Sequence, residues 1–207
     1  MAFIDLHKKE IQCKIVYYGP GRCGKTTNLL FIYNAMNVKG RGKLLTIETK
    51  GDRTLFFDLL PISLGKVAGF DIRIQLYTVP GQNLYEATRK LVLKGVDGIV
   101  FVADSLRIRK NKNIESFQDL FMNLKAQNRL MHDMPIVIQY NKRDLTASPI
   151  PTMSIEELES DINKDHKYPC FAASAIKGTG VFETLKEISK ITVRNVIHRN
   201  VLIQKQT

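Results

Sequence analysis

The residues best suited to chemistry lie in one short run, residues 19–26, which reads GPGRCGKT. The spacing G-x-x-x-x-G-K-T is typical of a loop that binds phosphate groups. Glycines let backbone N–H groups turn toward anionic oxygens, and the N-terminus of a following helix adds its positive dipole. Lys25 can then reach the terminal phosphates of a nucleotide, and the Thr26 hydroxyl can bind Mg²⁺. The predicted phosphate-binding residues of this run are Gly19, Pro20, Gly21, Arg22, Cys23, Gly24, Lys25, Thr26 and Thr27.

The elements on either side must position that loop. Residues 11–18 alternate and favour a strand, and residues 25–36 form an amphipathic helical pattern with no breaker. A glycine-rich turn that binds nothing is the alternative interpretation. A strand, a glycine-rich loop and a helix in that order favour phosphate binding over this alternative.

A second motif, N-K-x-D at residues 141–144, follows the apolar run 135–140. The Asp144 carboxylate can accept two parallel hydrogen bonds from guanine N1–H and the 2-amino group, and adenine offers no such pair of donors. Asn141 can tie this loop to the phosphate loop, and the aliphatic stem of Lys142 can stack on the purine. A plain polar turn is the alternative, which the preceding strand and the upstream phosphate loop disfavour.

A third short motif completes the predicted base site. Ser174 and Ala175 follow a strand predicted at residues 168–173. They offer a backbone N–H group near guanine O6, with Ile176 or Lys177 packing alongside. The predicted guanine-binding residues are Asn141, Lys142, Asp144, Ser174, Ala175 and Ile176.

Strand and helix patterns alternate along the chain, which predicts an α/β fold with a doubly wound, mostly parallel six-stranded sheet and one antiparallel edge. Strand patterns at 54–60 and 70–77, with a turn region at 61–69 between them, predict the antiparallel hairpin. We expect one nucleotide-binding domain over residues 1–207, with its core at about 11–198. Ligands bind at the carboxyl ends of strands in such sheets, and every motif lies at such an end.

Composition narrows the class of protein. The chain carries 31 Lys and Arg against 20 Asp and Glu, a net charge of +11, and three cysteines without metal-ligand spacing. We expect a reducing compartment, no signal peptide, no transmembrane segment and no lipid anchor. The excess of positive charge lacks interleaved aromatic residues or a nucleic-acid motif, so no nucleic-acid partner is predicted. Basic stripes at residues 107–112 and on the last helix (Lys186, Lys190 and Arg194) are solvated faces or docking sites for acidic partners or anionic lipid.

The order GxxxxGKT, xxPGQ, NKxD and SA resembles that of the Ras-like small GTPases, over about residues 12–197. The strings GDRTLFFD at 51–58, YTVPGQ at 77–82 and KGVDG at 94–98 are similar to those of the bacterial gliding-motility and cell-polarity GTPases of this family. The resemblance implies the small GTPase fold, a P-loop NTPase fold, with GTP or GDP as ligand and Mg²⁺ as cofactor.

The resemblance also implies roles for residues around the phosphates. Gln82 would orient the attacking water, and the Gly81 N–H group would touch the γ-phosphate. Thr54 would bind Mg²⁺ with Thr26, and Arg53 would act as an internal arginine finger. Gln82 as an ordinary helix-cap residue and Arg53 as a solvent-exposed side chain are the alternatives. Catalytic residues are therefore predicted at Gln82 and Arg53.

One position departs from the wider pattern. Most relatives carry Asp where this chain has Thr78, and that Asp holds Mg²⁺ through a water molecule. A hydroxyl can hold the water but removes a negative charge, which commonly weakens a metal site about ten- to a hundredfold. Asp52 and Asp58 are interpreted as structural or solvated. Cys23 is either a reactive thiol or a side chain that points away from the phosphates.

The function implied is a GTP-hydrolysing molecular switch that regulates cell polarity and gliding or surface motility. Its implied partners are a homodimeric activating protein of the roadblock/longin type (MglB-like) and motility or polarity effectors, including actin-like filaments. We expect a cytoplasmic protein recruited to a cell pole by protein partners. A nucleotide-held scaffold with negligible hydrolysis and a phosphotransferase are the alternatives. Thr78 leaves the scaffold open while Gln82 and Arg53 argue against it, and Asp144 argues against a phosphotransferase.

Overall fold

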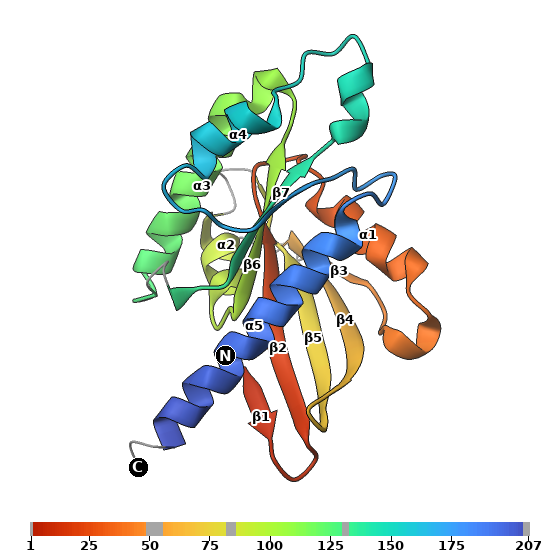
Figure 1. Ribbon diagram of the computed structural model, residues 1–207, viewed down its shortest axis with the longest axis vertical. Coiled ribbons are helices and arrows are strands. Elements are labelled where there is room, and N and C mark those ends of the chain that lie inside the picture. Colours follow the sequence, from red (N-terminus) through yellow and green to blue (C-terminus); the bar gives the residue numbers. More distant parts are fainter. Residues whose placement is uncertain (1, 49–55, 82–85, 130–132, 205–207) are drawn as a thin grey trace.

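A computed structural model describes residues 2–48, 56–81, 86–129 and 133–204, without the side chains of Glu48, Phe56 and residues 200–204. It shows a mixed sheet of eight strands with helices on both faces (Figure 1). The strands are β1 (Phe3–Asp5), β2 (Glu10–Tyr18), β3 (Leu45–Glu48), β4 (Phe56–Val67), β5 (Phe70–Thr78), β6 (Gly98–Asp104), β7 (Ile136–Asn141) and β8 (Cys170–Ala172). The helices are α1 (Lys25–Ala35), α2 (Glu86–Leu93), α3 (Lys110–Lys125), α4 (Ile155–Ile162) and α5 (Val181–Gln204), with 3₁₀ turns η1 (Val38–Gly40), η3 (Arg107–Arg109) and η5 (Arg143–Ala147).

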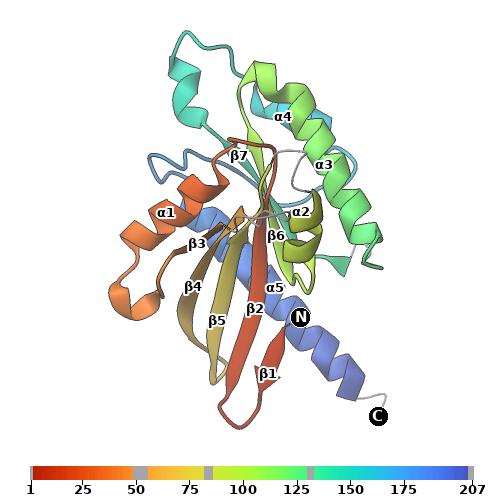
Figure 2. The same ribbon diagram turned by 180° about the vertical axis from the view of Figure 1, so that it is seen from behind.

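The two faces of the sheet are covered by different helices. Strand β2 alternates between them, because successive side chains of a strand point to opposite faces. Ile15 and Tyr17 join the core under α1 and α5, whereas Val16 and Tyr18 join the core under α2, α3 and α4. In Figure 1 helix α5 lies in front of the sheet with α2 and α3 behind it, and Figure 2 shows the reverse.

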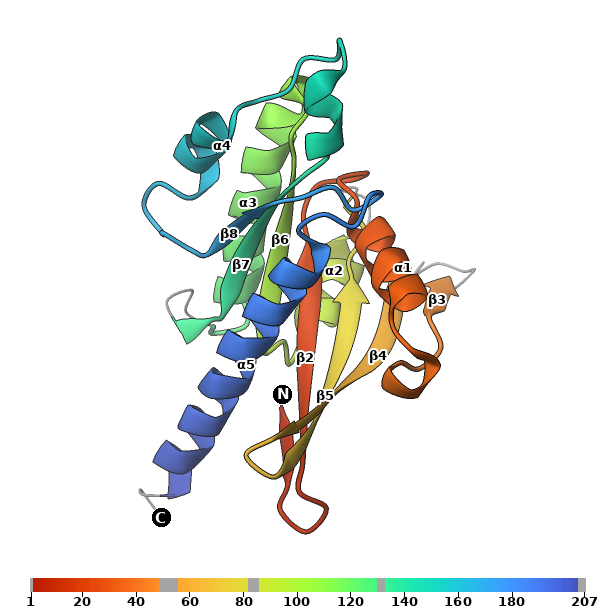
Figure 3. The ribbon, with the colours of Figure 1, turned by 45° about the vertical axis from the view of Figure 1, so that its right-hand side comes forward.

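The strand order is β3-β4-β5-β2-β6-β7-β8, and β5, β2, β6, β7 and β8 all run parallel. Every residue of β6 is buried, as expected for a central parallel strand covered on both faces. The carboxyl ends of β2, β5, β7 and β8 lie at one edge, where Figure 3 shows the connecting loops gathered above the sheet. The predicted fold class is confirmed, and each predicted motif lies at this edge.

The sheet has eight strands where six were predicted. Strand β1 pairs antiparallel with the first residues of β2, from Phe3 opposite Gln12 to Asp5 opposite Glu10. Strand β6 reaches β2 only from Ile15 onward, so the first residues of β2 have a free edge that β1 fills. Strand β3 adds a second antiparallel pair outside β4.

The turn predicted at residues 61–69 is also wrong in extent, because β4 continues through Pro61 to Val67. The Pro61 carbonyl accepts a hydrogen bond from the Gly42 N–H group at 2.8 Å, so the backbone N and O of residue 61 face away from β5. Proline lacks an N–H group and is tolerated on such an outer edge. The actual turn is shorter and lies between Val67 and Phe70.

The basic run 107–112 forms η3 and the first turn of α3. Its cations mostly have carboxylate partners: Arg107 lies 2.8 Å from Glu157, Lys110 lies 3.0 Å from Asp161, and Lys112 lies 2.7 Å from Glu115. A paired, solvated face is therefore the better description of this stripe. Across the described ranges no helix has the length and apolar character needed to cross a membrane.

Candidate nucleotide site

The phosphate loop joins β2, which ends at Tyr18, to α1, which begins at Lys25. Gly24 caps the helix with φ of 104°, in the left-handed region. A Cβ atom at this position would lie 2.2 Å from the side-chain nitrogen of Asn141. Both the backbone conformation and this close approach require glycine. The last glycine of the motif therefore lets the base loop and the phosphate loop touch.

Lys25 is held in place by the loop that it follows. Its ammonium group donates to the carbonyl oxygens of Gly19 and Pro20, both at 2.8 Å, and its side chain is almost fully buried. Cys23 is fully buried beneath the same loop, with its Sγ atom 3.6 Å from Lys25 Nζ. Burial raises the pKa of the Cys23 thiol, so it stays protonated at neutral pH. Of the two interpretations of Cys23, the buried and unreactive one fits the structure.

A cavity of about 530 Å³ opens beside the loop, at the N-terminus of α1. Its lining residues are Gly21, Arg22, Gly24, Lys25, Thr26, Thr27, Thr78, Val79, Pro80 and Gly81. They belong to the phosphate loop, to α1 and to the end of β5. Anions are favoured at such a helix N-terminus by free N–H groups and by the helix dipole. The arrangement suits a chain of phosphate groups.

A carboxylate that the sequence indicated to be structural or solvated lies beside this cavity. Asp58 on β4 is 1 % exposed and accepts hydrogen bonds from three threonine hydroxyls. The Oδ2 atom takes bonds from Thr26 at 2.6 Å and Thr78 at 2.8 Å, and the Oδ1 atom takes one from Thr46 at 2.9 Å. We call Thr26, Thr46, Asp58 and Thr78 the Asp58 cluster.

Strand register builds the Asp58 cluster. Thr46 lies directly opposite Asp58 in the β3–β4 pair, and the β4–β5 register brings Thr78 alongside, where its hydroxyl accepts from the Asp58 N–H group at 3.0 Å. Asp58 is thus not a solvated residue, and its burial with three hydroxyl donors fits the structural alternative. The signal for it was an acidic residue inside an otherwise apolar strand pattern, since a buried carboxylate requires partners.

Asp58 also changes the interpretation of Thr78. The negative charge that Thr78 removes from the end of β5 is present on the neighbouring strand, 2.8 Å from the Thr78 hydroxyl. Hydroxyl and carboxylate oxygens are the ligands that Mg²⁺ prefers, and Mg²⁺ usually takes few protein ligands together with waters and substrate phosphates. The described residues contain no group of three His, Cys, Asp or Glu side chains able to hold a metal alone. The donor set fits a magnesium ion shared with phosphates.

The base site is organised by Asn141, which is buried at the end of β7. Its side-chain nitrogen donates to the Cys23 carbonyl oxygen at 2.7 Å, and its side-chain oxygen accepts from the Ala175 N–H group at 2.8 Å. One amide therefore joins the phosphate loop, the N-K-x-D loop and the Ser-Ala loop. The tie that the sequence predicted between Asn141 and the phosphate loop is present.

The other base-loop residues lie around Asn141. Asp144 lies in η5, partly exposed, and its carboxylate takes no hydrogen bond or ion pair from the described part of the chain, so it is available to a ligand. The Lys142 ammonium is held 2.7 Å from Asp104, and Ile176 is exposed. A backbone N–H group of Ser174 or Ala175 was expected near guanine O6, but that of Ala175 donates to Asn141 and that of Ser174 to the Thr179 carbonyl. Ser174 accepts from the Lys177 N–H group and turns the loop.

Three predicted residues, Arg53, Thr54 and Gln82, lie outside the described residues. Gly81, directly before Gln82, packs against the phosphate loop: a Cβ atom there would lie 2.2 Å from the Gly21 nitrogen and 2.4 Å from the Pro20 carbonyl carbon. Gly81 thus lies in van der Waals contact with the phosphate loop.

Helix α2, which follows residues 82–85, is anchored by a buried polar cluster. Arg89 of α2 lies 3.0 Å from the Asp119 carboxylate of α3, and the Tyr18 hydroxyl at the end of β2 donates to the same carboxylate. Burial raises the Tyr18 pKa, as do its hydrogen bond to Asp119 and the charge of that group. No motif indicated this anchor, which ties α2 to the strand that begins the phosphate loop.

Comparison with known proteins agrees with the site. The sequence matches the ADP-ribosylation factor family (Arf) over residues 1–192. It is 51 % identical to "Mutual gliding-motility protein MglA" of Myxococcus xanthus (strain DK1622) over 193 residues, which cover 93 % of this chain and 96 % of that protein. It is 24 % identical to "ADP-ribosylation factor K" of Dictyostelium discoideum over 159 residues, or 77 % of this chain and 81 % of that one.

The phosphate loop, the N-K-x-D loop at the same sheet edge and the mixed, mostly parallel sheet agree with these matches. The match to the family extends over nearly the whole chain. This chain therefore belongs to the Arf family of small GTPases, which bind guanine nucleotides and hydrolyse GTP.

Proposed function

We propose that this protein is a Mg²⁺-dependent GTP switch that regulates cell polarity and gliding or surface motility, as a single GTP-binding domain over residues 1–207. Its 51 % identity to a gliding-motility protein over 93 % of the chain carries the proposal. We place it in the cytoplasm, recruited to a cell pole by protein partners. The proposed partners are a homodimeric roadblock/longin-type activating protein and motility or polarity effectors, including actin-like filaments.

In the proposed mechanism the described residues bind and orient GTP. Backbone N–H groups of the phosphate loop and the Lys25 ammonium hold the phosphates, and Asp144 accepts the two guanine donors. Asn141 holds the base loop in a fixed position relative to the phosphate loop through its bond to the Cys23 carbonyl oxygen. Because the N–H groups of Ser174 and Ala175 are used within the chain, guanine O6 would take the N–H group of Ile176.

At the other end, the hydroxyls of Thr26 and Thr54 would hold Mg²⁺, with Thr78 and Asp58 binding its water ligands. Mg²⁺ would neutralise charge on the β- and γ-phosphate oxygens. Asp58 accepts from both Thr26 and Thr78, which fixes the direction of these hydroxyls. The carboxylate weakens the argument for a scaffold that binds GTP without hydrolysing it, because that argument rested on a missing negative charge at Thr78.

For hydrolysis, Gln82 would orient a water molecule for attack on the γ-phosphorus, while the bond to the bridging oxygen breaks to leave GDP. Arg53 would stabilise the charge that spreads over the transferred group, an effect of about 10³–10⁵ in rate when an arginine is well placed. Gly81, the residue before Gln82 in the sequence, contacts the phosphate loop.

Single-turnover GTP hydrolysis, with and without a purified roadblock/longin-type activator, tests the proposal. We expect stimulation by the activator and a loss of about 10³-fold in Gln82→Leu and Arg53→Ala. Arg194→Ala, on the exposed side of α5, is the matched arginine control and should turn over GTP at the wild-type rate. Tight GTP binding without turnover under either condition would support the scaffold instead.

A further inference from the structure

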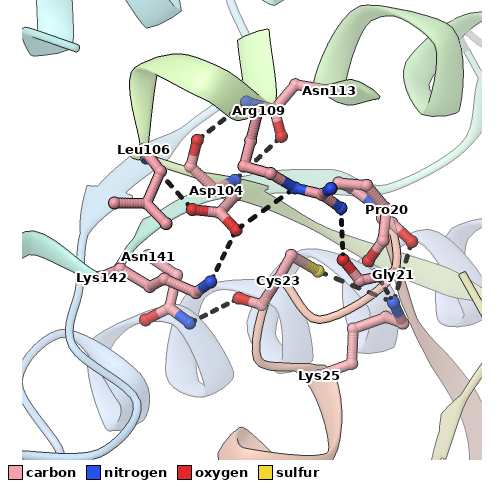
Figure 4. A network of polar contacts seen from close by, with 11 residues as sticks. Pro20, Gly21, Cys23, Lys25, Asp104, Leu106, Arg109, Asn113, Asn141 and Lys142 are labelled. Carbon is pink, nitrogen blue, oxygen red and sulfur yellow. Dashed lines mark hydrogen bonds and ion pairs between the residues drawn. The ribbon is translucent and has the colours of Figure 1, made fainter. Parts of the chain in front are cut away.

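A second buried carboxylate, Asp104, lies between the two nucleotide-binding loops at the end of β6 (Figure 4). It is fully buried, and its side chain accepts from the Lys142 ammonium at 2.7 Å and the Leu106 N–H group at 3.1 Å. The Arg109 Nε atom lies 3.9 Å away on the other side. Lys142 belongs to the base loop. A buried carboxylate needs such partners because isolated burial of a charge is costly.

The position of Asp104 is itself fixed. Its N–H group donates to the Asn113 side-chain oxygen at 2.9 Å, and its carbonyl oxygen accepts from the Asn113 side-chain nitrogen, also at 2.9 Å. Asn113 lies on α3 and is buried. This reciprocal pair locks the end of β6 to α3, so the carboxylate offers a rigid reference point to both loops.

Arg109 extends from this point to the phosphate loop. Its Nη2 atom donates to the Gly21 carbonyl oxygen at 2.7 Å. In a trans peptide the C=O and the following N–H group point in opposite directions. Because Arg109 fixes the Gly21 carbonyl, it also fixes the direction of the Arg22 N–H group, which points away from Arg109.

The cavities on either side of the loop show what that N–H group faces. Arg109 lines a cavity of about 800 Å³ on the α3 side, whereas the cavity of about 530 Å³ with Lys25 and Thr26 does not include it. Gly21 and Arg22 line both cavities and so form the wall between them. A carbonyl held on the α3 side leaves the Arg22 N–H group directed toward the phosphate side.

The backbone of Arg22 needs such support. Its φ is 64°, in the left-handed region that L-residues other than glycine adopt only at a cost. A hydrogen bond from a charged donor to the preceding carbonyl offsets that cost and holds the peptide in one orientation. Gly21 also contacts Gly81, so this peptide lies at the end of the loop that faces the segment leading to Gln82.

We propose that Arg109, held by Asp104, is a positioning residue of the phosphate loop that turns the Gly21–Arg22 peptide so that its N–H group binds the terminal phosphates. Because the same carboxylate holds Lys142, one buried residue sets both the base loop and the phosphate loop. The inference rests on the proposed guanine-nucleotide site and adds to it two residues that no motif marks.

Dissociation constants for GMP, GDP and GTP, measured by competition with a fluorescent GDP analogue, test this proposal. In Arg109→Ala we expect the dissociation constants of GDP and GTP to rise about tenfold, the effect of one charged hydrogen bond, and that of GMP to change less than about twofold. Arg109→Lys keeps a donor for the Gly21 carbonyl and should recover part of the GDP affinity. Asp104→Asn should weaken all three nucleotides, because it also releases Lys142.

Arg107→Ala is the matched control, since Arg107 lies in the same turn and, among the described residues, its side chain pairs with Glu157 and the Thr152 carbonyl, away from the loop. It should bind all three nucleotides as the wild type does. An equal loss for GMP and GDP in Arg109→Ala, or no loss for either, would overturn the proposal. A wild-type protein that binds no guanine nucleotide would instead overturn the proposed function itself.

Discussion

The base site and the Asp58 cluster lie at the same edge of the sheet but are assembled in different ways. At the base site, Asn141 and Asp144 lie within one loop, and Asn141 positions the neighbouring loops through hydrogen bonds to their backbone atoms. The Asp58 cluster draws its members from α1, β3, β4 and β5, and no two of them are close in sequence.

The difference teaches which sites a sequence motif can reveal. The geometry of a four-residue loop depends mostly on its own residues, so its sequence alone predicts its chemistry. A cluster across strands depends on register, and a shift of one residue would turn Asp58 to the other face of the sheet. The comparison predicts that changes at the base site alter which nucleotide binds, and that changes in the Asp58 cluster alter how strongly binding depends on Mg²⁺.

The largest expected effect is at the base site. Asp144→Ala removes the acceptor for both guanine donors, and each hydrogen bond to a charged group contributes about 1.5–3 kcal/mol. GDP affinity should therefore fall by about 10²–10⁴, without a gain for ADP and without a change in the Mg²⁺ dependence. Competition binding with GDP and ADP measures this. Retained preference for GDP would show that another residue selects the base.

Gly81→Ala perturbs the phosphate loop, which the base site contacts through Asn141 and the Asp58 cluster through Thr26. The added Cβ atom would lie 2.2 Å from the Gly21 nitrogen, so the phosphate loop or the segment before Gln82 must shift. Displacements of about 1 Å in a catalytic site cost on the order of a hundredfold in rate, and we expect that loss in single-turnover hydrolysis. Gly40→Ala is the control, because its nearest neighbour would be a Met36 methyl group at 3.4 Å. Equal hydrolysis rates for Gly81→Ala and Gly40→Ala would contradict the close contact between Gly81 and the phosphate loop.

Thr78→Asp tests whether the Asp58 cluster faces the metal. It places a second carboxylate beside Asp58, and adjacent like charges disfavour ionisation of both. In EDTA the unfolding free energy should fall by about 1–3 kcal/mol, and Mg²⁺ should restore it. Nucleotide affinity should depend on Mg²⁺ more steeply than in the wild type. Identical Mg²⁺ titrations of the two proteins would show that residue 78 does not face the metal.

The smallest expected effect comes from a substitution outside both sites, which serves as a reference for the other variants. Helix α4 begins with a capping box, in which Ser154 and Glu157 exchange hydrogen bonds of 3.2 and 2.8 Å. Ser154→Ala should lower the unfolding free energy by about 1 kcal/mol and leave nucleotide affinity and hydrolysis unchanged. Chemical denaturation measures the first quantity. A change in GDP affinity would mean that stability alone can mimic the effects above.

Much of the fold was predictable because its signals are local. The strand before Gly19, the buried run of β6 and the capping box at Ser154 each follow from patterns within a few residues. The extension of β4 through Pro61 was not, since it depends on Gly42 reaching the outer edge of that strand. Asp58, Asp104 and Arg109 escaped prediction for the same reason, because each acts on residues far away in the sequence.

The most direct test of the account is an Mg²⁺ titration of GDP and GTP affinity in Asp58→Asn, which keeps the size of the side chain but removes its charge. If Asp58 supplies the carboxylate that Thr78 lacks, the Mg²⁺-dependent part of the affinity should fall about ten- to a hundredfold, while affinity in EDTA stays at the wild-type value. Leu59→Met, on the same strand, is the control. An Asp58→Asn protein with the wild-type Mg²⁺ dependence would contradict the account.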